Sequence, residues 1–163
     1  MNSSTDLIRR TEEMFDRTSL LEGGISLREA IVMDNYGTMT ERKEARTQDE
    51  LTDWRRLVGT DHLKRHVDAG ALCFVDALGM RFYLPPCFVT ILPLDNPDDC
   101  PEISRAVLFH LSGADEQFAL LNQRQTVLIR DILLHWEQKT DRWHRRSVAE
   151  AIRSVARRLS TQY

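Results

Sequence analysis

Two histidines four residues apart are the sharpest candidate for a metal site in the sequence. His62 and His66 lie on one face of a predicted helix, where such a pair can present two imidazole nitrogens to one zinc ion. The residues between them are Leu-Lys-Arg, which add two cations and supply no glutamate base. Because neighbouring positive charges repel a divalent cation, a solvated helix face is favoured, and no metal or other cofactor is predicted.

The three cysteines, Cys73, Cys87 and Cys100, are candidates for nucleophilic chemistry. Their number and spacing give neither a complete disulfide framework nor a CxxC pair, so reduced thiols are expected. Cys73 lies in an apolar run and should pack as a small hydrophobe, whereas Cys100 lies in a polar loop and should be more exposed. Cys87, after a double proline, is the best-placed nucleophile, but the apolar residues that follow it favour core packing.

A polar cluster is predicted near the end of a helix at residues 26–36. It contains acids and an aromatic from that helix, which could combine with residues from across the fold as a recognition or acid–base site. Helix ends attract such side chains for capping reasons alone, so the capping interpretation is favoured. The predicted cluster consists of Glu29, Asp34, Tyr36, Arg81 and Tyr83.

The C-terminal segment 140–163 is predicted to be a basic helix. Lys139–Tyr163 carries seven Lys or Arg against two acids, a surplus of five, so with a net charge of −3 the first 138 residues carry −8. The basic surface could contact an acidic protein, nucleic acid or an anionic membrane, although a solvated helix face is favoured. The acidic body argues against nucleic acid as a partner. The predicted interaction surface consists of Arg142, Trp143, Arg146, Arg153, Arg157 and Arg158.

The length and amino-acid composition of the chain are those of a globular protein. The 163 residues are 29% charged and 42% hydrophobic, enough to build a core and too apolar for general disorder. No stretch approaches the roughly 20 apolar residues that cross a bilayer, and the start lacks the apolar core of a secretory signal. We therefore expect a cytoplasmic protein with no membrane contact. Residues 1–163 are treated as one domain, with a helix in 1–24 that could be peripheral.

Helical periodicity and capping residues predict most of the elements. Ser26, Thr60 and Asn122 suit helix N-caps, and Gly37 and Gly70 suit helix ends. The pattern of residues 86–94 and 103–111 fits strand and helix alike, and helix is preferred for the second. Helices are predicted at 4–19, 26–36, 60–69, 122–139 and 142–159, with a charged, helix-rich connection over 40–57.

Residues 79–86, GMRFYLPP, predict a β-hairpin. The apolar run before them, the turn-forming sequence DALG and the alternation of Met80, Phe82 and Leu84 fit two strands joined by a tight turn. The double proline then ends the ladder, because proline has no amide hydrogen to donate. The expected fold class is α+β, a predominantly helical domain packed on a small antiparallel hairpin or sheet at about 71–84.

Three segments resemble an uncharacterised family of small bacterial proteins, a domain of unknown function. They are ISLREAxxxDNYG, TDWRRL and ALCFVDxxGxRFYLP, followed by a late helix with a glutamine near its start. The resemblance covers roughly residues 25–136, and ALCFVDALGMRFYLP is its most specific part. It implies no established activity, substrate or catalytic residue. Bacterial proteins of this size include immunity partners of toxins, so an immunity- or regulator-like role is left open.

The leading functional hypothesis is a non-enzymatic protein-interaction domain with an unknown protein partner. It would contact that partner through the acidic body or the basic C-terminal helix. One alternative is a small enzyme whose site combines histidines and carboxylates in three dimensions. Another is weak nucleic-acid binding through the last helix. Convergence of His62 and His66 with a carboxylate or a cysteine in one concave pocket would favour the enzyme.

Overall fold

The chain is built of helices joined by short turns. The structure, a computed structural model, describes residues 3–113, 115–141 and 144–161, so Arg142 and Trp143 of the predicted basic surface lie outside the described residues. In chain order the elements are α1 (Ser4–Met14), α2 (Leu27–Asp34), α3 (Met39–Arg46), the 3-10 turn η1 (Trp54–Leu57), α4 (Asp61–Asp68), η2 (Ala71–Cys73), α5 (Ala77–Ile91), η3 (Pro97–Asp99), α6 (Pro101–Gly113), η4 (Asp115–Phe118), α7 (Gln123–Lys139) and α8 (Arg145–Thr161).

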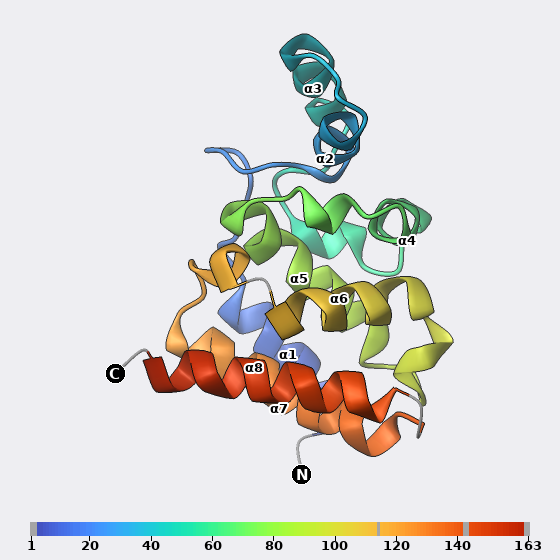
Figure 1. Ribbon diagram of the computed structural model, residues 1–163, viewed down its shortest axis with the longest axis vertical. Helices are drawn as coiled ribbons and strands as arrows, with labels where there is room; N and C mark the ends of the chain where they lie inside the picture. The colour runs from blue at the N-terminus through green and yellow to red at the C-terminus, as the bar shows by residue number, and fades with distance from the viewer. Residues whose placement is uncertain (1–2, 114, 142–143, 162–163) are drawn as a thin grey trace.

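The helices form a layered bundle from which one helix pair projects (Figure 1). Helix α8 packs on both α6 and α7 at one end of the molecule, and α1 packs on α5 and α7. Helix α4 packs on α6. Helices α2 and α3 pack on each other and extend away from the body at the opposite end. Among the described residues, none of the helices is long and apolar enough to cross a membrane.

Helix α5 is the centre of the core. Met80, Phe82, Tyr83, Leu84 and Phe88 are each at most 1% exposed, so the helix is covered on nearly every side. A helix that is apolar all round is stable only when it is buried in this way. Full burial of a phenylalanine such as Phe82 stabilises the fold by about 2–3 kcal/mol.

The predicted β-hairpin at 71–84 is wrong, and with it the α+β fold class. The structure has no β-strand in the described ranges; η2 and α5 occupy the hairpin segment, and the fold is all-helical. Asp76, expected to start a turn, is the N-cap of α5, because its carboxylate accepts hydrogen bonds from the amides of Gly79 at 2.9 Å and Ile25 at 3.1 Å. The same side chain therefore starts the central helix and ties the chain before α2 to it.

The physical reason for the error lies in burial on all sides. Alternation requires an exposed residue between buried ones, yet Tyr83, between Phe82 and Leu84, is only 1% exposed. Pro85 and Pro86 continue the helix although each removes an amide donor, a change that costs about 3 kcal/mol in an ordinary helix interior. Both prolines are buried, so tertiary packing outweighs the local preference that predicted a strand end.

Most of the remaining local predictions are confirmed. The Ser26 capping box is present, and the side chains of Thr60 and Asn122 accept hydrogen bonds at the starts of α4 and α7. The segments left open, 86–94 and 103–111, are helical through Ile91 and within α6. The first helix ends at Met14, earlier than expected.

One predicted helix stop is shifted by a residue. Tyr36, and not Gly37, adopts the left-handed conformation after α2, with φ of +57°. Gly37 is needed for space, since a Cβ there would lie 2.3 Å from Cγ1 of Val32. The connection between α2 and α3 thus places a tyrosine in a conformation that L-residues seldom adopt.

Candidate thiol site

A cysteine, a histidine and a glutamine from three separate elements meet at the surface. Sγ of Cys73, the last residue of η2, lies 3.8 Å from Nε2 of His110 on α6. Nδ1 of His110 lies 2.8 Å from Oε1 of Gln117 on η4. The order thiol, imidazole, amide is that of a nucleophile, its base and the group that orients the base.

The glutamine fixes which imidazole nitrogen carries the proton. The Nε2 amide group of Gln117 donates to the carbonyl oxygens of Leu72 and Val75, each at 2.8 Å, so Oε1 must face His110. An oxygen can only accept, and Nδ1 of His110 therefore carries the hydrogen. In the neutral ring this leaves the lone pair on Nε2, the nitrogen that faces Cys73.

The two carbonyls that accept hydrogen bonds from Gln117 also help to position the thiol of Cys73. Leu72 and Val75 flank Cys73, so Gln117 binds both the histidine and the turn that carries the cysteine. One side chain thereby sets the position of the base relative to the nucleophile.

Two surface pockets adjoin the thiol. They measure about 560 and 380 Å³, and both are lined by Cys73, His110 and Phe109. Cys73 is exposed, His110 is only 5% exposed and the Phe109 side chain is 71% exposed between the pockets. The thiol is therefore open to a substrate while most of its base is shielded from water.

Burial and helix geometry set the electrostatics of the site. Burial lowers the pKa of His110, and its hydrogen bond with Gln117 acts in the opposite direction. At neutral pH the imidazole is then uncharged and able to accept a proton. Asp76 and Ala77 at the start of α5 both line the larger pocket, so the capping carboxylate of Asp76 offsets the positive end of that helix there.

The structure reverses the sequence-based assignment of the cysteines. Cys73, expected to be buried, is exposed, and Cys100, expected to be more exposed, is buried. Burial raises the pKa of the Cys100 thiol and strongly raises that of Cys87, which is 0% exposed. Both are inert core thiols, which leaves Cys73 as the accessible nucleophile.

The two histidines considered as a metal site, His62 and His66, make structural contacts. Nε2 of His62 lies 3.1 Å from Oδ1 of Asp49, and Nδ1 of His66 lies 2.8 Å from the carbonyl of His62. Burial and the charge of His66 lower the pKa of His62, while Asp49 acts in the opposite direction. His66 lines a separate pocket beside α2 and α3, and none of the three cysteines lines that pocket.

The predicted polar cluster is divided between three places. Glu29 is ion-paired to Arg42 at 2.8 Å, and the buried hydroxyl of Tyr83 accepts a hydrogen bond from the amide of Leu27 at 3.1 Å. Burial is the main cause of the strongly raised pKa of Tyr83. Asp34, the last residue of α2, and Tyr36, which follows the helix, are exposed, and Arg81 lies half-buried on α5.

The described arginines of the predicted basic surface differ in their surroundings. Arg158 pairs with Asp115 at 2.7 Å, and Arg146 pairs with Glu150 of the same helix at 3.2 Å. Arg153 and Arg157 are exposed on α8, and a guanidinium nitrogen of Arg157 lies 3.4 Å from Oγ of Ser154. Part of the charge of this helix is therefore balanced within the chain.

Two residues of the thiol site were missed by sequence reasoning. His110 stands in an apolar stretch and Gln117 in a short polar segment, and neither has a spacing to Cys73 that marks a motif. The one available signal was a cysteine shortly before the start of a helix, a position that favours a reactive thiol. Reading that segment as a strand concealed the signal.

A model of a protein family described as "Family of unknown function (DUF6714)" matches residues 3–155, and the chain belongs to that family. The matched range contains the thiol site, the helix that centres the core and all but the end of α8. No curated protein and no solved structure matches the chain.

Proposed function

We propose that the chain is a cysteine-dependent enzyme that transfers or hydrolyses an acyl group. Cys73 is the nucleophile, His110 is the general base, and Gln117 holds His110 in position. The observation that carries the proposal is the fixed tautomer of His110, with an unprotonated nitrogen 3.8 Å from an exposed thiol. This geometry replaces the non-enzymatic hypothesis as the leading one.

The reaction follows from the positions of the groups. Nε2 of His110 takes the proton of Cys73 as sulfur attacks a carbonyl carbon, and a tetrahedral intermediate forms. The tetrahedral intermediate expels its leaving group, which receives that proton from His110. A water molecule, deprotonated by His110, then attacks the thioester, and the carboxylic acid and the free thiol are released.

The pocket walls favour certain acyl substrates. Phe109 offers an exposed ring beside the thiol, which suits an apolar group next to the reacting carbonyl. Asp76 and Glu116 line one pocket, and Asp68 and Glu102 line the other with a single arginine, Arg105. This surplus of acids favours neutral or cationic substrates over anionic ones.

Alkylation of Cys73 by iodoacetamide, followed by mass spectrometry of its peptide, tests the base. General bases contribute roughly 10²- to 10⁴-fold to rates, so at pH 7 we expect His110→Ala to slow the reaction at least about tenfold. His62→Ala is the matched control, a histidine beside a carboxylate, and should leave the rate unchanged. Equal rates in wild type and His110→Ala would sink the proposal.

A second measurement tests acyl transfer itself. With p-nitrophenyl acetate we expect a burst of p-nitrophenol and an acetyl group on Cys73, in a Cys87→Ser, Cys100→Ser background that leaves one thiol. Cys73→Ser should remove the burst. Absence of acetylation in the folded parent protein would contradict the assignment even if alkylation were fast.

A second candidate function, binding of a protein partner, is supported by the end of the α2–α3 pair. Tyr36 is 97% exposed and Met39 is 60% exposed, and both residue types are enriched at protein interfaces. Crosslinking in the native host should recover a partner that is lost in Tyr36→Ala, Met39→Ala but kept in Leu134→Ala, another exposed apolar residue. The reduced thiols fit a cytoplasmic setting, and an immunity- or regulator-like role would require such a partner.

A further inference from the structure

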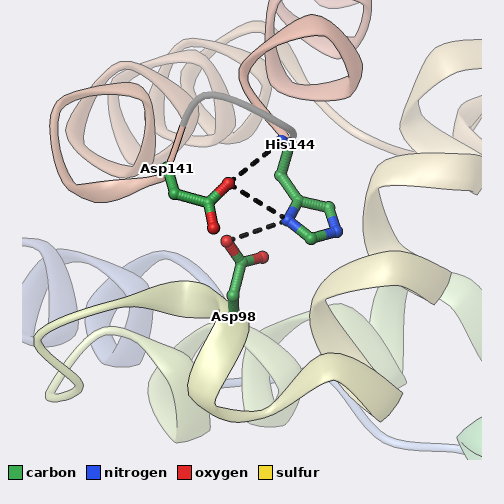
Figure 2. A group of neighbouring side chains, drawn as sticks. All are labelled: Asp98, Asp141 and His144. Atoms are coloured by element: carbon green, nitrogen blue, oxygen red, sulfur yellow. Dashed lines mark hydrogen bonds and ion pairs between the residues drawn. The ribbon is translucent and has the colours of Figure 1, made fainter.

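A histidine and two aspartates meet where three elements adjoin (Figure 2). Asp98 lies on η3, Asp141 follows α7, and His144 precedes α8. Nδ1 of His144 lies 3.0 Å from Oδ2 of Asp98 and 3.6 Å from Oδ1 of Asp141. One ligand atom from each of the three residues lies within 4.8 Å of the other two.

We infer that Asp98, Asp141 and His144 bind a divalent transition-metal ion of the zinc class. Bonds of about 2.0–2.2 Å around such an ion hold neighbouring donor atoms roughly 3.0–3.5 Å apart. The two distances from Nδ1 agree with that spacing. One imidazole nitrogen with carboxylate oxygens is a donor set that suits zinc and its neighbours in the first transition row.

No hydrogen bond joins the carboxylate of Asp98 to the ring of His144. Oδ2 of Asp98 and Nδ1 of His144 are both buried atoms without a hydrogen-bond partner, although they are only 3.0 Å apart. At that distance an N–H aimed at the oxygen would form a hydrogen bond. Ligands of one metal ion instead aim at the ion and not at each other, which brings donor atoms close without that alignment.

The burial of Asp98 also suits a bound cation. Its side chain is just 16% exposed and lies 3.0 Å from Nδ1 of His144, and removing a carboxylate from water is costly unless a positive charge compensates it. Lys139 donates to the carbonyl of Leu94 at 2.9 Å, and Arg145 donates to the carbonyl of Thr140 at 3.3 Å. These two cations are directed to backbone oxygens, and a bound divalent ion would place positive charge beside Asp98.

A pocket adjoins the histidine of the site. His144 also lines a pocket of about 510 Å³ between α6 and α8, together with Ser147 and Glu150. Three protein ligands leave room for water or a ligand atom in the remaining coordination position. The ion would join the end of α7 and the start of α8 to the turn before α6.

Titration of EDTA-dialysed protein with zinc chloride, followed by calorimetry, tests the site. The Cys73→Ser background is used because the thiol and His110 could also take zinc. We expect one zinc per chain, and at least about tenfold weaker binding in Asp98→Asn and in His144→Gln, since each removes a donor. Cobalt chloride should give visible absorption bands that His144→Gln abolishes.

The control is His62→Gln, which alters a histidine–aspartate contact of similar length and should bind zinc as the parent does. Circular dichroism and thermal melting without metal establish that each variant is folded. Absence of stoichiometric zinc binding by the parent overturns the inference. Unchanged binding in both Asp98→Asn and His144→Gln, or equal loss in His62→Gln, overturns it as well.

Discussion

His62 and His110 each have a ring nitrogen close to the side chain of one other residue, Asp49 or Cys73, and these two side chains differ in exposure. His62 lies against Asp49, whose carboxylate is 1% exposed and also accepts a hydrogen bond from the amide of Arg28 at 2.8 Å. His110 lies against the exposed thiol of Cys73. His62 therefore contacts a buried group and contributes to the structure. His110 instead directs its unprotonated nitrogen at a thiol that solvent and substrates can reach.

The comparison separates residues that hold the structure from residues that could do chemistry. Asp49 joins the segment after α3 to α2 and α4, so its loss disrupts packing between elements. Cys73 ends a short turn, and its sulfur is exposed and lies 3.8 Å from Nε2 of His110, a long contact that should add little to packing. Variants of the two regions should therefore affect different measurements.

The largest effect on stability is expected for Asp49→Ala. Removing a buried carboxylate leaves the amide of Arg28 and the ring of His62 without an acceptor, which should lower the free energy of unfolding by about 3 kcal/mol. Urea denaturation measures it. A decrease in the free energy of unfolding of less than about 1 kcal/mol would show that the contacts of Asp49 with Arg28 and His62 do not hold the structure together.

A smaller effect, on reactivity, is expected for Gln117→Leu. Without the side-chain oxygen the ring of His110 can turn, and alkylation of Cys73 at pH 7 should slow about tenfold, part of the roughly 10²- to 10⁴-fold that a positioned base supplies. Gln117→Glu keeps an acceptor for Nδ1–H and adds a negative charge. In that variant the pH at which alkylation is half-maximal should rise.

Acid should weaken the fold through both histidines. Burial lowers the pKa of His62 and of His110, so the unfolded chain binds protons more readily than the native one. Stability is then lost as pH falls from about 6.5, the unfolded value, towards the lower native values. Urea midpoints between pH 5 and 7 measure the loss, and His110→Gln should reduce it. A midpoint independent of pH would contradict the direction of both shifts.

The smallest effect on stability is expected for Cys73→Ser. The side chain is exposed and its contact with His110 is long, so the change should alter the free energy of unfolding by no more than about 0.5 kcal/mol. The same change removes the nucleophile, so alkylation and acetylation at this position should cease. A large loss of stability would assign the thiol to the fold.

Local signals in the sequence predicted the helix caps but not the central helix. Ser26, Thr60 and Asn122 act through atoms within three residues, so their roles can be read from short stretches. The stretch from Ala77 to Ile91 depends on neighbours that cover it from every side. A two-residue alternation and a double proline then favour a strand, and only the tertiary packing reverses that preference.

The thiol site depends on the same long-range arrangement. His110 lies 37 residues after Cys73 in the chain, and Gln117 reaches back 45 residues to Leu72. No short pattern records such contacts. Exposure of the thiol also could not be predicted, because the surrounding sequence is apolar while Cys73 and Phe74 at the end of the 3-10 turn are exposed.

None of the residues of α3 is buried, so ion pairs and hydrogen bonds of its arginines contribute much of what holds it to α2 and to the segment before α2. The guanidinium of Arg46 binds backbone carbonyls of Leu20 and Gly24, and Arg42 pairs with Glu29. Attraction of this kind fades as dissolved ions accumulate around it. In concentrated sodium chloride the amide hydrogens of α3 should therefore exchange with deuterium ahead of those of α5, which would make this arm the first part of the molecule to detach and the easiest for a protease to remove.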